Sequence, residues 1–457
     1  KLWLQYSESD DQGYILEGDE ASRTFKGKLH ITGTSGECKS KTLAEAMLED
    51  NKVLPDRTNF NVTNTSNTTG TIYQTNKTED GSTVYYYSGN TANNWVKFGK
   101  ETVQECTYNG LQVYYGIYNE GISYYKEVRK VASSDECVST NVCSDYFYGP
   151  IVGLTEEQCG NVGGTWTTDK ATAGNKTEKD IYWRIIRTNE DGSVRMLYSG
   201  LDSATTQGFI GGSVFNLNYN DPMYAGYMYG TSGSLANNRT NTNDSTIKTF
   251  IDKWYEDTLL TNYDKYISKT AIYCNDRSTQ NNSYSTSDAF YYSSYTRLDN
   301  NTPTYKCGGN TSDGLFESTQ ALADKFSVST EGGGNGQLKY SIAMMTIDEI
   351  SFAGGLIWTD LDSPYAWFYT NSQGRSIASD NNYGFWWSLS PYRWLVDSAD
   401  VWVVGGSDSS GSGSLSDIPV QGDAGLRPAL SLSSCVKMTG RGTADDPYEI
   451  DESASTC

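Results

Sequence analysis

The chain has 457 residues and a formal net charge of −21 at pH 7, and 37% of its residues are hydrophobic. The negative charge argues against nucleic acid and anionic membranes as partners, because no basic patch stands out that could neutralise phosphates. The 45 glycines, the 35 tyrosines and the scarcity of long helical patterns predict a loop-rich, mostly β protein of the α+β class. No apolar stretch is long enough to span a membrane, and because the chain starts at Lys1 we expect an N-terminal segment to have been removed or to lie outside this sequence.

Residues 1–80 are expected to form an N-terminal β-rich region with one short helix. Alternating apolar residues predict strands within residues 1–35, and the good helix formers of residues 41–50 predict the helix. The polar Asn/Thr tract 56–80 is interpreted as a loop or an edge strand.

Residues 81–457 are interpreted as one domain with an insert. Strands are expected at 83–89 and 93–99, on either side of a short Asn/Gly turn. Four cysteines and several glycine-rich turns mark the insert, at about residues 101–181. The clearest hairpin follows at residues 182–199, where two β-branched runs flank the turn NEDG.

Three helices are expected in the second half of the chain. Residues 245–259 carry one apolar stripe at i, i+3, i+4, i+7 and i+8. A short helix begins at Thr346, where Thr346 and Glu349 form a capping box and Gly354 supplies the stop. A third is predicted over residues 318–326.

Beyond residue 363 the pattern is one of short strands, with tryptophans concentrated among them. Because neighbouring side chains of a strand face opposite ways, Trp386 and Trp387 cannot share one core face. One is expected to pack in the core and the other to lie at a surface, an interface or a second layer. The stretch after Pro391 is expected to begin a ligand-facing loop. The expected strands are 366–370, 385–391, 400–406 and 426–432.

The nine cysteines form no Cys-x-x-Cys pair and the chain has one histidine, which argues against a zinc site. We interpret the scattered cysteines as disulfides formed in an oxidising compartment. The pairs Cys274–Cys307 and Cys435–Cys457 are expected because each is local, and the odd cysteine is left free or bonded outside the chain.

A catalytic role is not expected. His30, in a polar strand, cannot supply a Ser-His-Asp or Cys-His site with a nameable partner, so a secreted hydrolase ranks third among the functions. No metal and no cofactor are expected. Calcium binding through oxygen ligands remains an alternative to a plain loop for one acidic group, although the chain contains no EF-hand loop. That group comprises Asp360, Asp362, Asp380, Asn381 and Asn382.

Several segments in a fixed order resemble an uncharacterised domain family of bacterial surface proteins. The segments are STVYYYSGNTANNWVKFG, YWRIIRTNEDGSVRMLYSG, IYCNDRS, SIAMMTIDEISFAGG, FWWSLSP, GLRPALSL and GRGTADDPYEI. The C-terminal half of this family resembles C-type-lectin-like domains of the subtype shared by formylglycine-generating enzymes and the variable proteins of retroelements. The resemblance implies short helices flanking small twisted antiparallel sheets, with WSLSP and GLRPA as paired strands. The triplets of calcium-dependent sugar-binding lectins and a pair of active-site cysteines are missing from this chain.

The resemblance also implies where functional residues lie. Arg427 would be buried before Pro428 and held by a carboxylate such as Asp348 or Glu349. The positions that vary in the retroelement proteins correspond here to candidate ligand-binding residues: Tyr392, Arg393, Trp394, Asp397, Trp402, Ser407, Asp408 and Ser409.

These features favour an extracellular, non-enzymatic surface protein, secreted or attached to the cell surface, that acts as an adhesin or as the displayed domain of a pilus-like appendage. Its partner would be a glycan or a protein at a cell surface. The alternative is a structural subunit that self-assembles into a filament or sheath, motivated by the Tyr/Asn/Gly-rich strands and by the segment KLWLQYS, which could join a neighbour's sheet edge.

Overall fold

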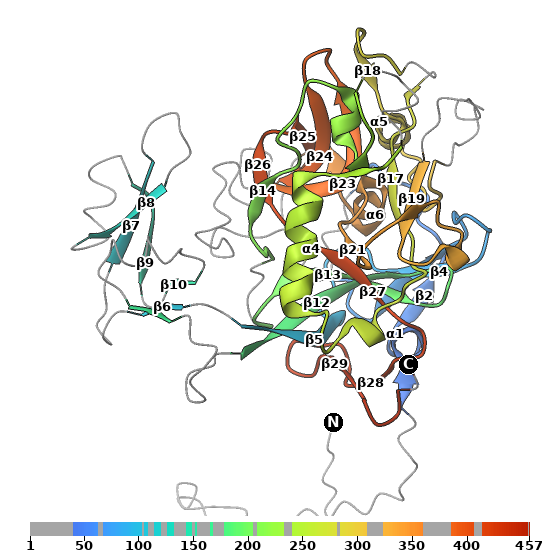
Figure 1. The fold of residues 1–457 in the computed structure, drawn as a ribbon. Helices are drawn as coiled ribbons and strands as arrows, with labels where there is room; N and C mark the ends of the chain where they lie inside the picture. Colours follow the sequence, from blue (N-terminus) through green and yellow to red (C-terminus); the bar gives the residue numbers. More distant parts are fainter. Residues whose placement is uncertain are drawn as a thin grey trace, which may run out of the picture. The chain divides into compact units, whose positions relative to one another are not determined.

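The computed structural model describes most of the chain after Ser40 (Figure 1). The described residues are 40–62, 67–102, 178–203, 208–232, 240–280, 284–308, 323–359, 385–405, 414–455 and 457, with the backbone of six strands between 105 and 167. The strands expected in residues 1–35, His30, the acidic group from Asp360 to Asn382 and the strand 366–370 lie outside them. The compact unit that contains the described residues begins at Ser40.

The largest sheet of the described residues has eleven strands. Eight follow the order β1, β28, β29, β5, β12, β13, β27 and β21, and β4, which also pairs with β12, carries β3 and then β2. Their bounds are β1 Lys41–Thr42, β2 Lys52–Leu54, β3 Thr71–Thr75, β4 Val84–Tyr86, β5 Trp95–Thr102, β12 Glu178–Thr188, β13 Val194–Gly200, β21 Ile342–Ala343, β27 Ala429–Leu432, β28 Lys437–Thr439 and β29 Tyr448–Ile450.

The predicted hairpin is confirmed at the centre of this sheet. β12 and β13 pair antiparallel, and the turn is closed by a hydrogen bond from the Asn189 N–H to the Ser193 carbonyl. β12 also pairs with β5, where Glu178 lies opposite Thr102. The chain between these two residues therefore leaves and rejoins the sheet at neighbouring positions.

The second sheet has seven described strands in the order β14, β26, β23, β24, β25 and β22, with β18 also paired to β23. The predicted pairing of WSLSP with GLRPA is wrong, because β27 lies in the first sheet between β13 and β21. Only Gly425 of the GLRPA segment lies beside β23, opposite Trp386. The bounds are β14 Gly212–Val214, β18 Phe290–Tyr291, β22 Leu356–Ile357, β23 Phe385–Trp394, β24 Ala399–Gly405, β25 Ser414–Pro419 and β26 Asp423–Gly425.

Smaller sheets complete the described strands. The helix predicted over 318–326 is wrong for residues 323–326, because β19 pairs antiparallel with β17 and buries Phe326. The bounds are β17 Tyr273–Asp276, β19 Ala323–Ser327 and β20 Gly336–Gln337; β15 Met228–Tyr229 and β16 Asn243–Asp244; β6 Glu105–Thr107, β10 Ile151–Val152 and β11 Thr165–Thr167; and β7 Tyr114–Asn119, β8 Lys126–Val131 and β9 Cys143–Tyr148.

The described helices are short, and α4 is the longest of them. Its predicted apolar stripe is confirmed, since Ile247, Ile251, Trp254 and Tyr255 are buried, whereas Phe250 remains 37% exposed. The bounds are α1 Leu43–Asp50, α4 Thr246–Thr258, α5 Ser293–Asp299 and α6 Ile347–Ala353, with one-turn 3₁₀ helices at Pro222–Ala225, Asp264–Tyr266 and Thr330–Gly332.

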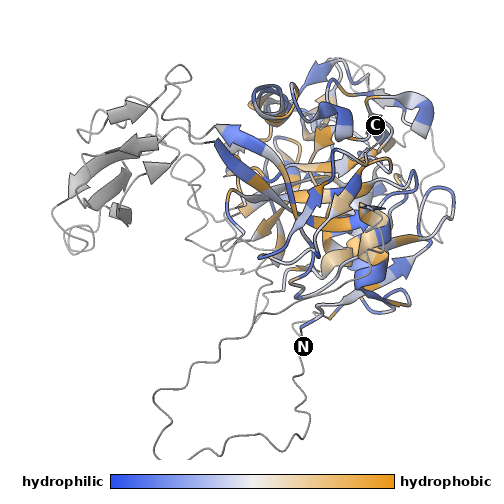
Figure 2. Ribbon diagram, turned by 90° about the horizontal axis from the view of Figure 1, so that it is seen from below, coloured by the Kyte–Doolittle hydropathy of each residue, from blue (hydrophilic) through white to orange (hydrophobic). Residues whose placement is uncertain are grey.

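The core consists of buried side chains on both sides of β23. Trp387 belongs to the main cluster and packs edge-on against Phe215, whereas Trp386 belongs to a second cluster. Both tryptophans are fully buried, so the second one occupies a second core layer. Figure 2 shows hydrophobic residues concentrated on the inner strands of the body and hydrophilic ones along its outer loops.

The described chain is thus mostly β with short helices, as the sequence predicted, and its two main sheets contain parallel as well as antiparallel pairs. No described helix is long and apolar enough to cross a membrane.

Ile251→Ala is expected to lower the free energy of unfolding by about 2–5 kcal/mol, because it leaves a cavity where α4 packs on the core. Denaturant unfolding measures the change. Lys253→Ala, on the exposed side of the same helix, is the matched control and is expected to stay within about 0.5 kcal/mol of the wild type. Equal losses in the two variants would contradict this packing.

Candidate functional site

The first turn of α6 places two carboxylates inside the protein. Thr346 and Glu349 form the predicted capping box, in which each side chain accepts a hydrogen bond from the other residue's backbone N–H. All seven helical residues are buried, including Asp348 and Glu349. A buried carboxylate must be paired with a cation or give up its charge, so the surroundings of this turn decide its chemistry.

Glu349 is paired with two arginines of the large sheet. Its Oε1 accepts hydrogen bonds from Arg187 Nε at 2.9 Å and from Arg195 Nη1 at 3.2 Å. The guanidinium groups of these arginines stack on Tyr305 and Tyr273, respectively. Burial opposes ionisation of Glu349, but the charges of the two arginines outweigh it and hold the pKa of Glu349 below its usual range.

Asp348 is paired with a third arginine. Arg297 of α5 donates from Nε and Nη2 to the two oxygens of Asp348, both at 2.8 Å, and from Nη1 to Asp276 of β17 at 2.8 Å. Burial opposes the charge of Arg297, yet the two carboxylates outweigh it and raise the pKa of the guanidinium. This bidentate geometry fixes α5, α6 and β17 against one another.

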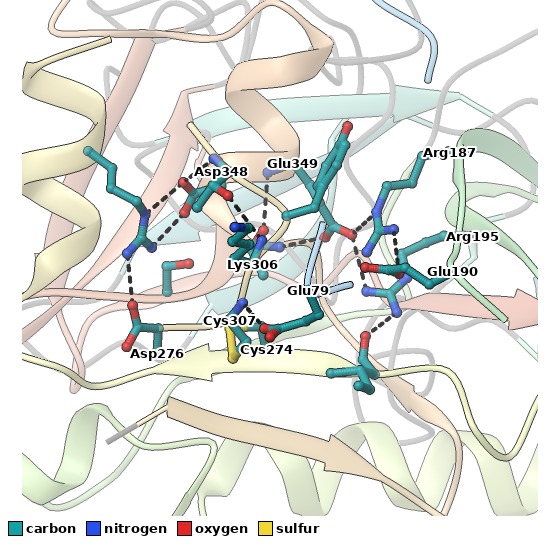
Figure 3. A pocket seen from close by; sticks show the side chains of 16 residues that line it. Glu79, Arg187, Glu190, Arg195, Cys274, Asp276, Lys306, Cys307, Asp348 and Glu349 are labelled. Carbon is teal, nitrogen blue, oxygen red and sulfur yellow. Dashed lines mark hydrogen bonds and ion pairs between the residues drawn. A yellow bond between two sulfur atoms is a disulfide. The ribbon is translucent and has the colours of Figure 1, made fainter. Parts of the chain in front are cut away.

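We call these charged side chains the charged centre. They surround a small cavity, shown in Figure 3. Figure 3 shows Asp348 on one side of it and the Arg187–Glu349–Arg195 group on the other. The cavity volume is about 30 Å³, enough for one water molecule and too small for an organic ligand. We interpret the charged centre as structural. Among the described residues, no group of three or more His, Cys, Asp or Glu side chains could hold a metal ion.

The predicted partners of Arg427 are wrong. Asp348 and Glu349 bind the three arginines of the charged centre, whereas Arg427, which is buried as expected, donates to the backbone carbonyl of Tyr198 and lies over the ring of Trp386. Burial lowers the pKa of Arg427 to about 9.

A different set of side chains forms an accessible surface at the end of the second sheet, which we call the aromatic face. Trp358, just after β22, is 50% exposed and lies 5.8 Å from Tyr392 and 5.6 Å from Trp402, measured between ring centroids. Tyr291 and Tyr295 stack on each other at 4.4 Å and pack edge-on against Tyr392. The exposed ring of Trp358 therefore rests on buried aromatic rings.

A charged group borders the aromatic face. Arg393 donates from Nε to the buried Asp400 at 2.8 Å, and its Nη2 lies 3.2 Å from Asp417. Asp417 lies directly opposite Trp402 on the neighbouring strand. Burial and the nearby charge of Asp400 outweigh the attraction of Arg393 and raise the pKa of Asp417 to about 7.

The predicted ligand-binding residues do not form one group in the structure. Tyr392, Arg393 and Trp402 lie together at the aromatic face, but Trp402 is fully buried and Tyr392 nearly so. Trp394 packs in the main core, and Asp397 is exposed in the turn between β23 and β24. Direct contact with a ligand by Trp394 or Trp402 would require them to leave the core. Ser407, Asp408 and Ser409 lie outside the described residues.

Four contributors to the aromatic face were not among the candidate ligand-binding residues: Trp358, Tyr291, Tyr295 and Asp417. A helix beginning near residue 293 would place Tyr295 close to Tyr291, but no apolar periodicity marks the short helix α5. Asp417 could be found only through its register against Trp402, which depends on strand pairing.

The two predicted disulfides, Cys274–Cys307 and Cys435–Cys457, are confirmed. The first ties β17 to the chain beside the charged centre. Disulfides of this kind are typical of proteins that fold in an oxidising compartment. Comparisons with protein-family models, with curated proteins and with solved structures found no match to the chain.

Glu349→Gln is expected to lower the free energy of unfolding at neutral pH by about 3–5 kcal/mol, because it leaves Arg187 and Arg195 buried without their carboxylate. Since the pKa of Glu349 is lowered, its stabilising contribution is present above the ordinary value of 4.5 and is lost as the pH falls through the folded value. The free energy of unfolding should therefore decrease less in the variant than in the wild type as the pH is lowered. Glu190→Gln, at the partly exposed rim, is the control, and an equal loss there would refute the assignment.

Asp417→Asn is expected to change stability in the opposite pH direction. A raised pKa means that the protonated carboxyl favours the folded state, a contribution that is fully present below the ordinary value of 3.8 and is lost as the pH rises through about 7. The variant should gain in unfolding free energy, relative to the wild type, as the pH rises from 4 to 7. Asp397→Asn, in an exposed turn, is the control. If the difference in unfolding free energy between Asp417→Asn and the wild type does not change with pH, the pKa of Asp417 is not raised.

Proposed function

We propose that the protein is an extracellular, non-enzymatic surface protein that binds a glycan or protein ligand through its aromatic face. The observation that carries the proposal is Trp358, a large ring that is half exposed and yet held from below by Tyr392 and Trp402. Exposed aromatic rings in fixed positions bury much area on binding with little loss of side-chain freedom, which is why they dominate recognition surfaces.

The backbone at this position supports the same proposal. Trp358 has a φ of 52°, in the left-handed region that bulky residues rarely adopt, and its N–H is held by the carbonyl of Leu415. Such conformations persist only where the surrounding structure enforces them, and they cluster at functional sites. The strain favours a role for the exposed ring beyond packing.

The C-type-lectin-like fold belongs to this proposal. Short helices beside mostly antiparallel sheets and an accessible aromatic surface near the end of β23 support it. The two disulfides support an extracellular location. A non-enzymatic role is supported by the charged centre, whose carboxylates Asp348 and Glu349 are engaged by arginines in a cavity the size of one water molecule.

Trp358→Ala is expected to weaken binding at least tenfold, because it removes the exposed ring that would stack on the ligand. The full chain would be applied to an array of surface glycans and extracellular matrix proteins, and each hit would be measured with both variants. Tyr219→Ala removes a similarly exposed aromatic ring outside the aromatic face and is the matched control. An array without binding, or hits that respond equally to the two substitutions, would reject the proposal.

A further inference from the structure

A groove that shares no residue with the aromatic face runs along α4. Its volume is about 700 Å³, within the range of sites that bind ligands. Figure 1 shows α4 beside β14, and the two are joined where α4 begins by hydrogen bonds from Ile247 N–H to the Phe215 carbonyl and from Leu217 N–H to Thr246 Oγ1. The groove lies between the outward side of the helix and the chain of β14 with its following loop.

The helix lines the groove over almost its whole length. The lining residues recur at helical spacing, namely Thr246, Thr249, Phe250, Lys253, Trp254 and Asp257. At 1.5 Å per residue this wall is ~16 Å long. An extended peptide advances ~3.3 Å per residue, so about five residues would fill it. Phe250 and Trp254, one turn apart, are about 6 Å apart along the helix axis, close to the repeat of alternate side chains on a strand.

The groove offers apolar surface that the described chain leaves open. Leu217 is 70% exposed and Phe250 is 37% exposed, and both line it. The ring of Phe250 lies against Gly211, where any side chain would collide with it. The contact with Gly211 holds one edge of the Phe250 ring, while the exposed part of the ring lines the groove.

Two buried hydrogen-bond donors of lining residues, Asn216 Nδ2 and Trp254 Nε1, have no partner among the described residues, and the first of them lies at the loop side of the groove. Asn216 is 2% exposed, and its Oδ1 accepts a hydrogen bond from the Asn218 N–H. That bond fixes which end of the amide is the oxygen and leaves Nδ2 without an acceptor. An unsatisfied buried donor is costly, and a ligand carbonyl would remove that cost.

The charges of the groove are already paired. Asp257 binds Lys253, and Asp244 binds Lys248. In a chain with a net charge of −21, this is a locally neutralised surface. Its electrostatic complement is an uncharged segment, and the ligand oxygen that Asn216 requires is supplied by every peptide unit.

We propose that this groove binds an extended, uncharged peptide segment of a partner protein, with alternate apolar side chains against Phe250, Trp254 and Leu217 and a backbone carbonyl on Asn216 Nδ2. The inference is independent of the ligand proposed for the aromatic face. It assigns the protein a second recognition surface, for a polypeptide.

The test uses the full chain and immobilised peptides in which leucine and serine alternate, compared with peptides of the same composition in which the leucines are grouped. Alternating peptides should bind at least about tenfold more tightly. Phe250→Ser and Leu217→Ser should each reduce that binding at least about tenfold, because both side chains would contact the peptide. Leu260→Ser, an exposed leucine just beyond α4 that does not line the groove, should leave it unchanged.

Asn216→Asp tests the polar contact, because it keeps the acceptor for the Asn218 N–H and replaces the unpartnered donor by an oxygen. This substitution should weaken the binding of the alternating peptides. Thermal unfolding of the variant checks that the chain is still folded. Equal binding of both peptide series, or binding unaffected by Phe250→Ser and Leu217→Ser, would overturn the proposal. A concentration-dependent dimer that Phe250→Ser dissolves would also overturn it, since the groove would then be a contact between copies of this chain.

Discussion

The fold depends on how the protein accommodates two carboxylates on the first turn of a wholly buried helix. Asp348 and Glu349 are ionic groups in a region without bulk water, where an unpaired charge would be prohibitive. Three arginines neutralise them, and these come from β12, β13 and α5. Because buried ion pairs add little net stability over an apolar core but are strongly disrupted by loss of one partner, their main effect is to fix which elements lie together.

Features that are local in the chain could be predicted from the sequence, whereas contacts between distant residues could not. The capping box of Thr346 and Glu349 and the glycine stop were visible because they are local in the chain. The hairpin β12–β13 and the apolar stripe of α4 were likewise periodic patterns. The arginine partners of Glu349 are 162 and 154 residues away from it, and no local spacing could reveal them.

Long-range pairing also accounts for the errors. Residues 323–326 contain helix-forming Ala and Lys, yet pairing with β17 and burial of Phe326 override that preference. Within the segment GLRPA, Gly425 lies beside β23, whereas Ala429 begins β27 in the largest sheet. The partners of β27, β13 and β21, lie far away in the sequence, so no local pattern could identify them. At the aromatic face, the sequence singled out Tyr392, Arg393 and Trp402 from the end of the chain, while Tyr291 and Tyr295 reach the site through the antiparallel pairing of β18 with β23.

Helix α5 links the charged centre to the aromatic face. On one side, Arg297 binds Asp348, and Ser293 donates to Asp276. On another, Ser294 accepts a hydrogen bond from the indole of Trp402 and donates to the carbonyl of Pro391, while Tyr295 packs against Tyr392. Since α5 has only seven residues, its position is set by these contacts rather than by its own helical stability. The buried ion pairs therefore fix the rings that support Trp358, and the rigidity that the proposed recognition surface requires originates in the charged centre.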